Sequence, residues 1–185
     1  GSDISLLGFS PDQSILAIKS NGSIRLLRAE DRLLINGFAG CSIMFQSNNQ
    51  GLLIDNCLGQ VNYYLFNSDR SKVNLESTFS GKGIYDDWQQ PIKAGVFSSD
   101  NKNILLTKTT GVKYSDFLTE IQSVELTTGE GTRFPVDNNS ANLIDAIWIP
   151  GLETYGVLVR DFDFIGEFLV LEKDSATLRE VIGKE

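Results

Sequence analysis

At four places in this chain an aromatic residue closes a short apolar segment, and a polar turn follows it. These aromatics are Phe9, Phe45, Phe97 and Trp148, and they recur at spacings of roughly 36, 52 and 51 residues. The next apolar segment begins about six or seven residues after each of them, so the differences in spacing fall in later connections, where insertions are tolerated. This regularity indicates one structural unit that is repeated four times.

The first unit shows the pattern most clearly. Residues 4–27 contain three short apolar segments that are separated by polar turns at residues 10–13 and 20–23, and a fourth segment follows at residues 32–38. Elsewhere, as at residues 60–66, apolar and polar side chains alternate with the period of two that is typical of a β-strand. Apolar periodicity of helical length is missing, so each unit is predicted to be four antiparallel strands.

The sequence therefore predicts an all-β fold, which is a β-propeller or a partial propeller of four four-stranded antiparallel blades. The single domain covers residues 1–185, with blades at about residues 3–40, 41–80, 91–137 and 141–183. In the third blade, residues 92–97 are expected to be the first strand and residues 109–117 an extended loop. Three arrangements stay open: an open arc that needs further blades, a closed ring of four, and another all-β arrangement such as a sandwich.

Two stretches of the first unit, residues 9–17 and residues 21–27, resemble a blade of the WD-repeat family. In that family a phenylalanine-serine-proline-aspartate turn joins the two inner strands, as it does here, and residues 97–100 form a weaker second copy. The chain departs from the family in having no histidine and in placing Leu27 and Arg28 where tryptophan and aspartate would stand. The resemblance implies a divergent WD-repeat-like propeller.

Composition limits the classes of partner. The net charge is -8, and because phosphate contacts need clustered Lys and Arg, we expect no nucleic-acid partner. No apolar run approaches the roughly 20 residues that span a bilayer, so we expect no membrane insertion. A basic or neutral protein partner suits this charge best.

Two residue counts bear on chemistry. The chain has no histidine, and its only cysteines are Cys41 and Cys57. Without histidine, the usual base of serine and cysteine hydrolases and all histidine metal sites are excluded, so we expect no catalysis, no metal and no cofactor. Two cysteines are too few for a disulfide scaffold. We therefore expect reduced thiols and a cytoplasmic location.

The candidate binding residues come from longer connections that carry aromatic and charged side chains. In a propeller, the connections between blades and those between second and third strands share one face. Aromatic residues and arginine dominate binding energy at protein surfaces, so we expect this face to bind a partner. Its residues are Tyr85, Asp86, Asp87, Trp88, Lys113, Tyr114, Asp116, Phe117, Arg160, Asp161, Phe162 and Asp163. Alternatively, Trp88, Phe117 and Phe162 fold back to cover blade edges.

Three hypotheses for function follow. In the first, the chain is a non-catalytic scaffold module that docks a protein partner through the acidic-aromatic loop face or through an open blade edge. That partner supplies missing blades or is a second copy of the chain. In the second, the propeller binds or hydrolyses a small ligand such as a glycan with its loop carboxylates. In the third, the chain is a structural part of a larger protein whose function lies elsewhere.

Overall fold

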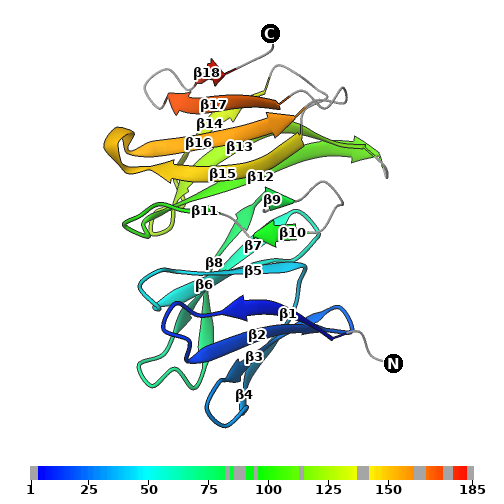
Figure 1. The fold of residues 1–185 in the computed structure, drawn as a ribbon, viewed down its shortest axis with the longest axis vertical. Helices are drawn as coiled ribbons and strands as arrows, with labels where there is room; N and C mark the ends of the chain where they lie inside the picture. Colours follow the sequence, from blue (N-terminus) through cyan, green and yellow to red (C-terminus); the bar gives the residue numbers. More distant parts are fainter. Residues whose placement is uncertain are drawn as a thin grey trace.

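The strands of the protein form four four-stranded antiparallel sheets, and within each sheet they lie in chain order. Figure 1 shows these sheets following one another from the N-terminal end of the molecule to the C-terminal end. The predicted all-β fold of four four-stranded blades is confirmed. The computed structural model describes residues 4–81, 84–85, 91–93, 96–112, 115–136, 142–160, 166–172 and 177–182.

The first two blades are meanders with short turns. The first blade contains β1 (Ile4–Phe9), β2 (Ile15–Ser20), β3 (Ser23–Arg28) and β4 (Leu34–Ala39). The second blade contains β5 (Ser42–Phe45), β6 (Gly51–Asp55), β7 (Gln60–Phe66) and β8 (Val73–Ser80). Among the described residues, the last strand of each of these blades pairs only with the third strand, so it is an edge strand of its sheet.

The last two blades repeat this order after a small additional sheet. That sheet pairs β9 (Ile84–Tyr85) with β10 (Pro91–Lys93). The third blade contains β11 (Val96–Phe97), β12 (Asn103–Val112), β13 (Ser115–Glu125) and β14 (Gly131–Pro135). The fourth blade contains β15 (Asn142–Ile149), β16 (Thr154–Arg160), β17 (Gly166–Glu172) and β18 (Thr177–Ile182), with a 3-10 turn, η1 (Pro150–Leu152), between its first two strands.

Two predictions about the third blade are wrong. Residues 92–97 do not form one strand, because β10 pairs with β9 whereas β11 pairs with β12. Residues 109–117 do not form a loop, because β12 and β13 stay paired as far as Val112 and Ser115. The β-branched residues of this segment favour an extended strand, and a long hairpin satisfies their backbone groups in a way that an isolated loop would not.

Apolar side chains fill the space between neighbouring blades. The strand period of two gives each sheet two faces, and facing side chains from adjacent blades form three core clusters. Between the first and second blades the buried members are Ile15, Ala17, Ile24, Leu26, Leu52, Ile54 and Val73. Leu53 and Leu106 belong to the second cluster, and Phe134 and Tyr155 to the third. Stability therefore comes mainly from burial between neighbours in the stack.

Polar contacts between turns also join neighbouring blades. The turn after the first strand holds a residue in the left-handed conformation, which is Asn49 in the second blade (φ 61°) and Asn101 in the third (φ 59°). Asparagine adopts this conformation more readily than most residues. The Oδ1 atom of Asn49 accepts a hydrogen bond from the Asp12 backbone N–H at 3.1 Å, and that of Asn101 accepts one from Ser47 N–H at 3.1 Å. Each asparagine ties its blade to the preceding one.

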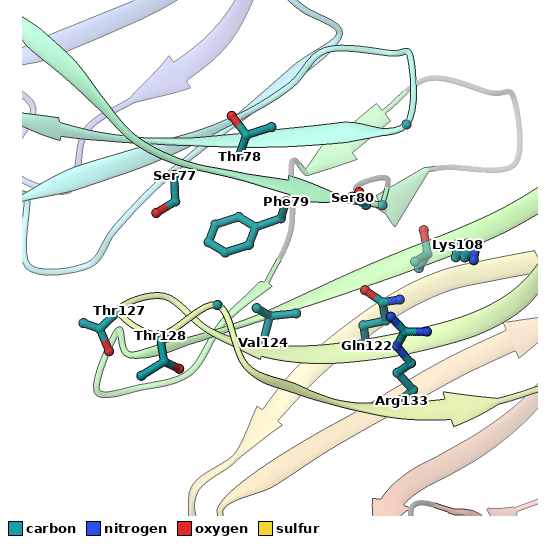
Figure 2. A pocket seen from close by; sticks show the side chains of 14 residues that line it. Ser77, Thr78, Phe79, Ser80, Lys108, Gln122, Val124, Thr127, Thr128 and Arg133 are labelled. Atoms are coloured by element: carbon teal, nitrogen blue, oxygen red, sulfur yellow. The ribbon is translucent and has the colours of Figure 1, made fainter.

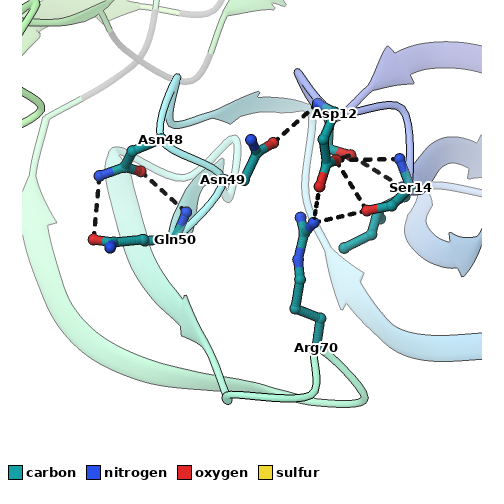
Figure 3. A network of polar contacts seen from close by, with 8 residues as sticks. Asp12, Ser14, Asn48, Asn49, Gln50 and Arg70 are labelled. Atoms are coloured by element: carbon teal, nitrogen blue, oxygen red, sulfur yellow. Dashed lines mark hydrogen bonds and ion pairs between the residues drawn. The ribbon is translucent and has the colours of Figure 1, made fainter.

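An ion pair strengthens the first of these joints (Figure 3). Arg70, in the turn between β7 and β8, donates hydrogen bonds to Asp12 Oδ2 and, at 2.7 Å, to Ser14 Oγ. Asp12 Oδ1 also accepts from the Ser10 hydroxyl at 2.7 Å and from Ser14 N–H at 3.1 Å. Burial raises the pKa of the Asp12 carboxyl, but these hydrogen bonds and the charge of Arg70 outweigh it and hold that pKa well below its usual range.

We expect Asp12→Asn to lower the free energy of unfolding by about 1 kcal/mol at neutral pH, because it removes a charged but partly exposed acceptor. The native pKa of Asp12 is depressed, so its contribution is complete above the unfolded-state pKa of about 3.9 and is lost as the pH falls toward the native value. Thermal unfolding should therefore show a difference in Tm between wild type and variant that shrinks below about pH 4. Asp31→Asn, at the exposed pair with Arg28, is the control. A Tm difference that does not change with pH would contradict the expectation.

Candidate functional site

The residues predicted to bind a partner lie partly within the described chain. Tyr85 belongs to β9, Asp116 and Phe117 belong to β13, and Arg160 is the last residue of β16. The others lie outside the described residues: Asp86, Asp87, Trp88, Lys113, Tyr114, Asp161, Phe162 and Asp163. That these side chains share one binding face stays a prediction.

A disulfide bond joins Cys41 to Cys57, whose Cα atoms are 5.4 Å apart. The prediction of two reduced thiols is therefore wrong. Cys41 lies in the connection between the first two blades, and Cys57 lies in the turn between β6 and β7. Cysteines that are 16 positions apart in sequence meet here only because the sheet brings that connection and that turn to the same end, which spacing alone cannot show.

The next connection between blades makes a similar junction. The backbone N–H of Gly81, which follows β8, donates to the carbonyl of Gly59 in the β6–β7 turn at 2.9 Å. Together with the disulfide, this contact places two connections between blades beside a turn that joins second and third strands. These are the two kinds of connection that the sequence assigned to one face of a propeller.

The first blade has an apolar face that no other described blade covers, because only its opposite face packs against the second blade. The strand period and the cross-strand pairs place β1, β2, β3 and β4 side chains together on this uncovered side. We call it the first-blade face, and its residues are Ile4, Leu6, Phe9, Leu16, Ile18, Arg25, Leu27 and Leu34. Ile4 and Leu6 are 65% and 64% exposed. Gathered apolar side chains of this kind are typical of an interaction surface.

The fourth blade has a corresponding face. Its opposite side packs against the third blade through Tyr155 and its neighbours. Cross-strand pairing groups the side chains of the uncovered side, which we call the last-blade face: Asp145, Ile147, Ile149, Leu158 and Phe168. Ile147 is 52% exposed. Figure 1 shows the first and fourth blades at opposite ends of the molecule, so the four blades form an open arc and not a closed ring.

A groove of about 700 Å³ lies between the second and third blades (Figure 2). Residues Ser77 to Ser80 of β8 form one wall, and β12, β13, β14 and the turn between β13 and β14 form the other. Phe79 and Val124 supply its apolar lining, and both side chains are almost fully buried. Figure 2 shows Phe79 directed from β8 toward the opposite wall.

Two basic residues are the charged side chains that line this groove within the described part of the chain. They are Lys108 from β12 and Arg133 from β14, and Figure 2 shows them at the same end of the groove with Gln122. The Arg133 side chain is 69% exposed, and its Nε lies 3.9 Å from Glu120 Oε1. In a chain with a net charge of -8, this local basic lining favours an anionic ligand. Sequence reasoning missed it because the two residues come from different strands and form no cluster in the sequence.

The hydrolytic alternative requires two carboxyl groups about 5 to 10 Å apart. Among the described residues no Asp or Glu lines the groove, and the residues predicted for this role, Asp86, Asp87, Asp161 and Asp163, lie outside the described part of the chain. Within the described part of the chain, no cluster of His, Cys, Asp and Glu residues is suited to hold a metal ion. The helical segments that the structure describes include none that is long and apolar enough to cross a membrane.

No family model matches this sequence, and no curated protein sequence matches it. Several solved structures are nevertheless similar to it. The β-propeller domain of Cps50 (Swd1) from Myceliophteria thermophila aligns with a TM-score of 0.58 and 12% identity, over 87% of this chain and 50% of that one. A chain of the mitotic checkpoint complex aligns with a TM-score of 0.60 and 15% identity, over 92% and 50%. Sqt1 from Saccharomyces cerevisiae aligns with a TM-score of 0.63 and 10% identity, over 95% and 49%.

At such low identity these likenesses establish the fold alone. In each case nearly all of this chain aligns with about half of the other, so the chain spans about half the length of the structures it matches. The four sheets in chain order and the open arc agree with part of such a ring. The chain therefore has the fold of a partial β-propeller with four four-stranded blades.

Proposed function

We propose that this chain is a non-catalytic protein-interaction module that docks a partner through its open blade faces. The observation that carries the proposal is the first-blade face, where Ile4, Leu6 and Phe9 are at least half exposed. Burial of apolar surface is worth roughly 25 cal/mol per Å², so a partner that covers this face gains binding free energy. Because the second blade covers the opposite face of the same sheet, the fitting partner presents another four-stranded sheet.

A second copy of this chain has such a sheet at each of its two ends, in its first and its fourth blade. In this arrangement the first-blade face of each copy packs on the last-blade face of the other, and a twofold axis closes the ring. Charge supports this arrangement, because the first-blade face carries Arg25 and the last-blade face carries Asp145.

Leu6→Asp is expected to weaken self-association by more than about tenfold, because it places an unpaired carboxylate in an apolar interface. Ile147→Asp should have the same effect from the last-blade face. Sedimentation velocity over a range of protein concentrations measures the dimer dissociation constant for each variant.

Leu58→Asp is the matched control, since Leu58 is 86% exposed and lies in the β6–β7 turn, outside both faces. It should associate as the wild type does. A wild-type protein that stays monomeric at every concentration, or a Leu6→Asp variant that associates normally, would contradict docking through these faces.

The acidic-aromatic loop face is a second proposed docking surface, for a basic or neutral protein. The residues proposed for it are Tyr85, Asp86, Asp87, Trp88, Lys113, Tyr114, Asp116, Phe117, Arg160, Asp161, Phe162 and Asp163. Supporting it are the Cys41–Cys57 bond and the contact between Gly59 and Gly81, which join connections of the kinds that would carry these residues.

We also propose a cytoplasmic location, as the sequence predicts. The Cys41–Cys57 disulfide bears on this location, because disulfides persist mainly in oxidising compartments. In the cytoplasm the bond would have to resist reduction by the glutathione pool.

A further inference from the structure

The groove between the second and third blades is bordered by strands with open edges. Among the described residues, β8 pairs only with β7 and β14 pairs only with β13. An edge strand presents backbone N–H and C=O groups that can pair with an added extended chain. Residues Ser77 to Ser80 of β8 line the groove directly, so an extended peptide in the groove would lie alongside this edge strand.

The basic end of the groove selects the charge of that peptide. The guanidinium group of Arg133 has a planar fork that suits a carboxylate, and Lys108 adds a compact positive charge. The distance of 3.9 Å between Arg133 Nε and Glu120 Oε1 is longer than a hydrogen bond, so Arg133 Nε forms an ion pair with Glu120 but no hydrogen bond. Gln122 donates its amide N–H to Glu120, and this contact occupies part of that carboxylate.

We propose that this groove binds an extended acidic peptide segment of a partner protein. The peptide backbone pairs with the open edge of β8, and its acidic side chains reach Lys108 and Arg133. The residues between the acidic ones point to the opposite side of the added strand. This site is separate from both open blade faces, so peptide binding here can be tested independently of docking through those faces.

Fluorescence anisotropy tests the proposal with a fluorescein-labelled peptide of alternating valine and glutamate. The wild-type protein should bind this peptide and not the valine-lysine counterpart. Lys108→Glu combined with Arg133→Glu should weaken binding of the acidic peptide by at least about tenfold, because two attractions become repulsions. Lys108→Gln combined with Arg133→Gln should give a smaller loss, and this neutral pair is the fallback if the reversed pair unfolds.

Lys72→Glu is the matched charge control, because Lys72 is exposed and does not line the groove. It should leave binding unchanged. A peptide with N-methylated alternate amides should bind more weakly, since it keeps the charge and loses backbone donors. The proposal is overturned if the wild type does not bind the acidic peptide, if the double variants bind it normally, if the N-methylated peptide binds equally well, or if single-stranded DNA competes for the groove more strongly than the peptide.

Discussion

Replacing both Cys41 and Cys57 with serine is expected to lower the free energy of unfolding by about 3 kcal/mol, the usual contribution of a disulfide that closes a loop of this length. The bond spans 16 positions in sequence and fixes the connection between the first two blades to the β6–β7 turn. The backbone N–H of Cys41 also donates to the Asp55 carbonyl at 2.7 Å, and that of Cys57 donates to the Asp55 carboxylate at 2.8 Å. Opening the bond therefore loosens an anchored junction.

Urea unfolding with and without a thiol reductant measures this effect. The reductant should shift the wild-type midpoint to lower urea concentration and leave the double serine variant unchanged. Alkylation of the unreduced protein should label neither cysteine. Two labelled cysteines, together with a midpoint that does not respond to reductant, would show that the bond is absent.

Phe134→Ala is expected to lower the free energy of unfolding by about 3–5 kcal/mol, the range measured when a large buried aromatic side chain is truncated. Phe134 in β14 is fully buried and packs with Tyr155, Val157 and Leu171 of the fourth blade. The cavity that alanine leaves would lie at the interface of two blades. Such an interface can relax only by moving one whole sheet against the other.

Urea unfolding monitored by circular dichroism measures this loss. Leu58→Ala is the control for truncation of an apolar side chain, since Leu58 is 86% exposed and should change stability by less than about 0.5 kcal/mol. Phe134→Leu keeps most of the apolar volume and should cost clearly less than alanine. Equal losses for Phe134→Ala and Leu58→Ala would show that the third and fourth blades are not held together by this cluster.

The strand pattern of the first, second and fourth blades was predictable because it rests on local signals. Alternation of apolar side chains marks strands such as β7, and the polar turns between strands mark their ends. The prediction for part of the third blade was wrong, because its local composition is typical of a loop whereas its strands stay paired. Residues 109–117 contain a glycine and several polar side chains that are typical of loops, yet cross-strand pairing between β12 and β13 extends through them. Pairing depends on the partner strand, which a local pattern does not contain.

The candidate sites also differ in whether local sequence signals can reveal them. The sequence singled out aromatic and acidic loops because these residue types are conspicuous in the chain. The groove was missed, because Lys108 and Arg133 are ordinary basic residues of two different strands. The Cys41–Cys57 bond and the Arg70–Asp12 ion pair were missed for the same reason, since each joins segments that only the stacking of sheets and blades brings together.

By itself, the sequence determined that four units of antiparallel strands would form, and the repeat with its resemblance to a WD-repeat blade favoured a propeller. The strands need only side-chain periodicity and turn chemistry, which act over a few residues. Only the tertiary structure decided that the blades form an open arc, which faces stay uncovered, and where a basic groove opens in an acidic chain. These features depend on which strands become neighbours, and packing between sheets decides that over separations of tens of residues.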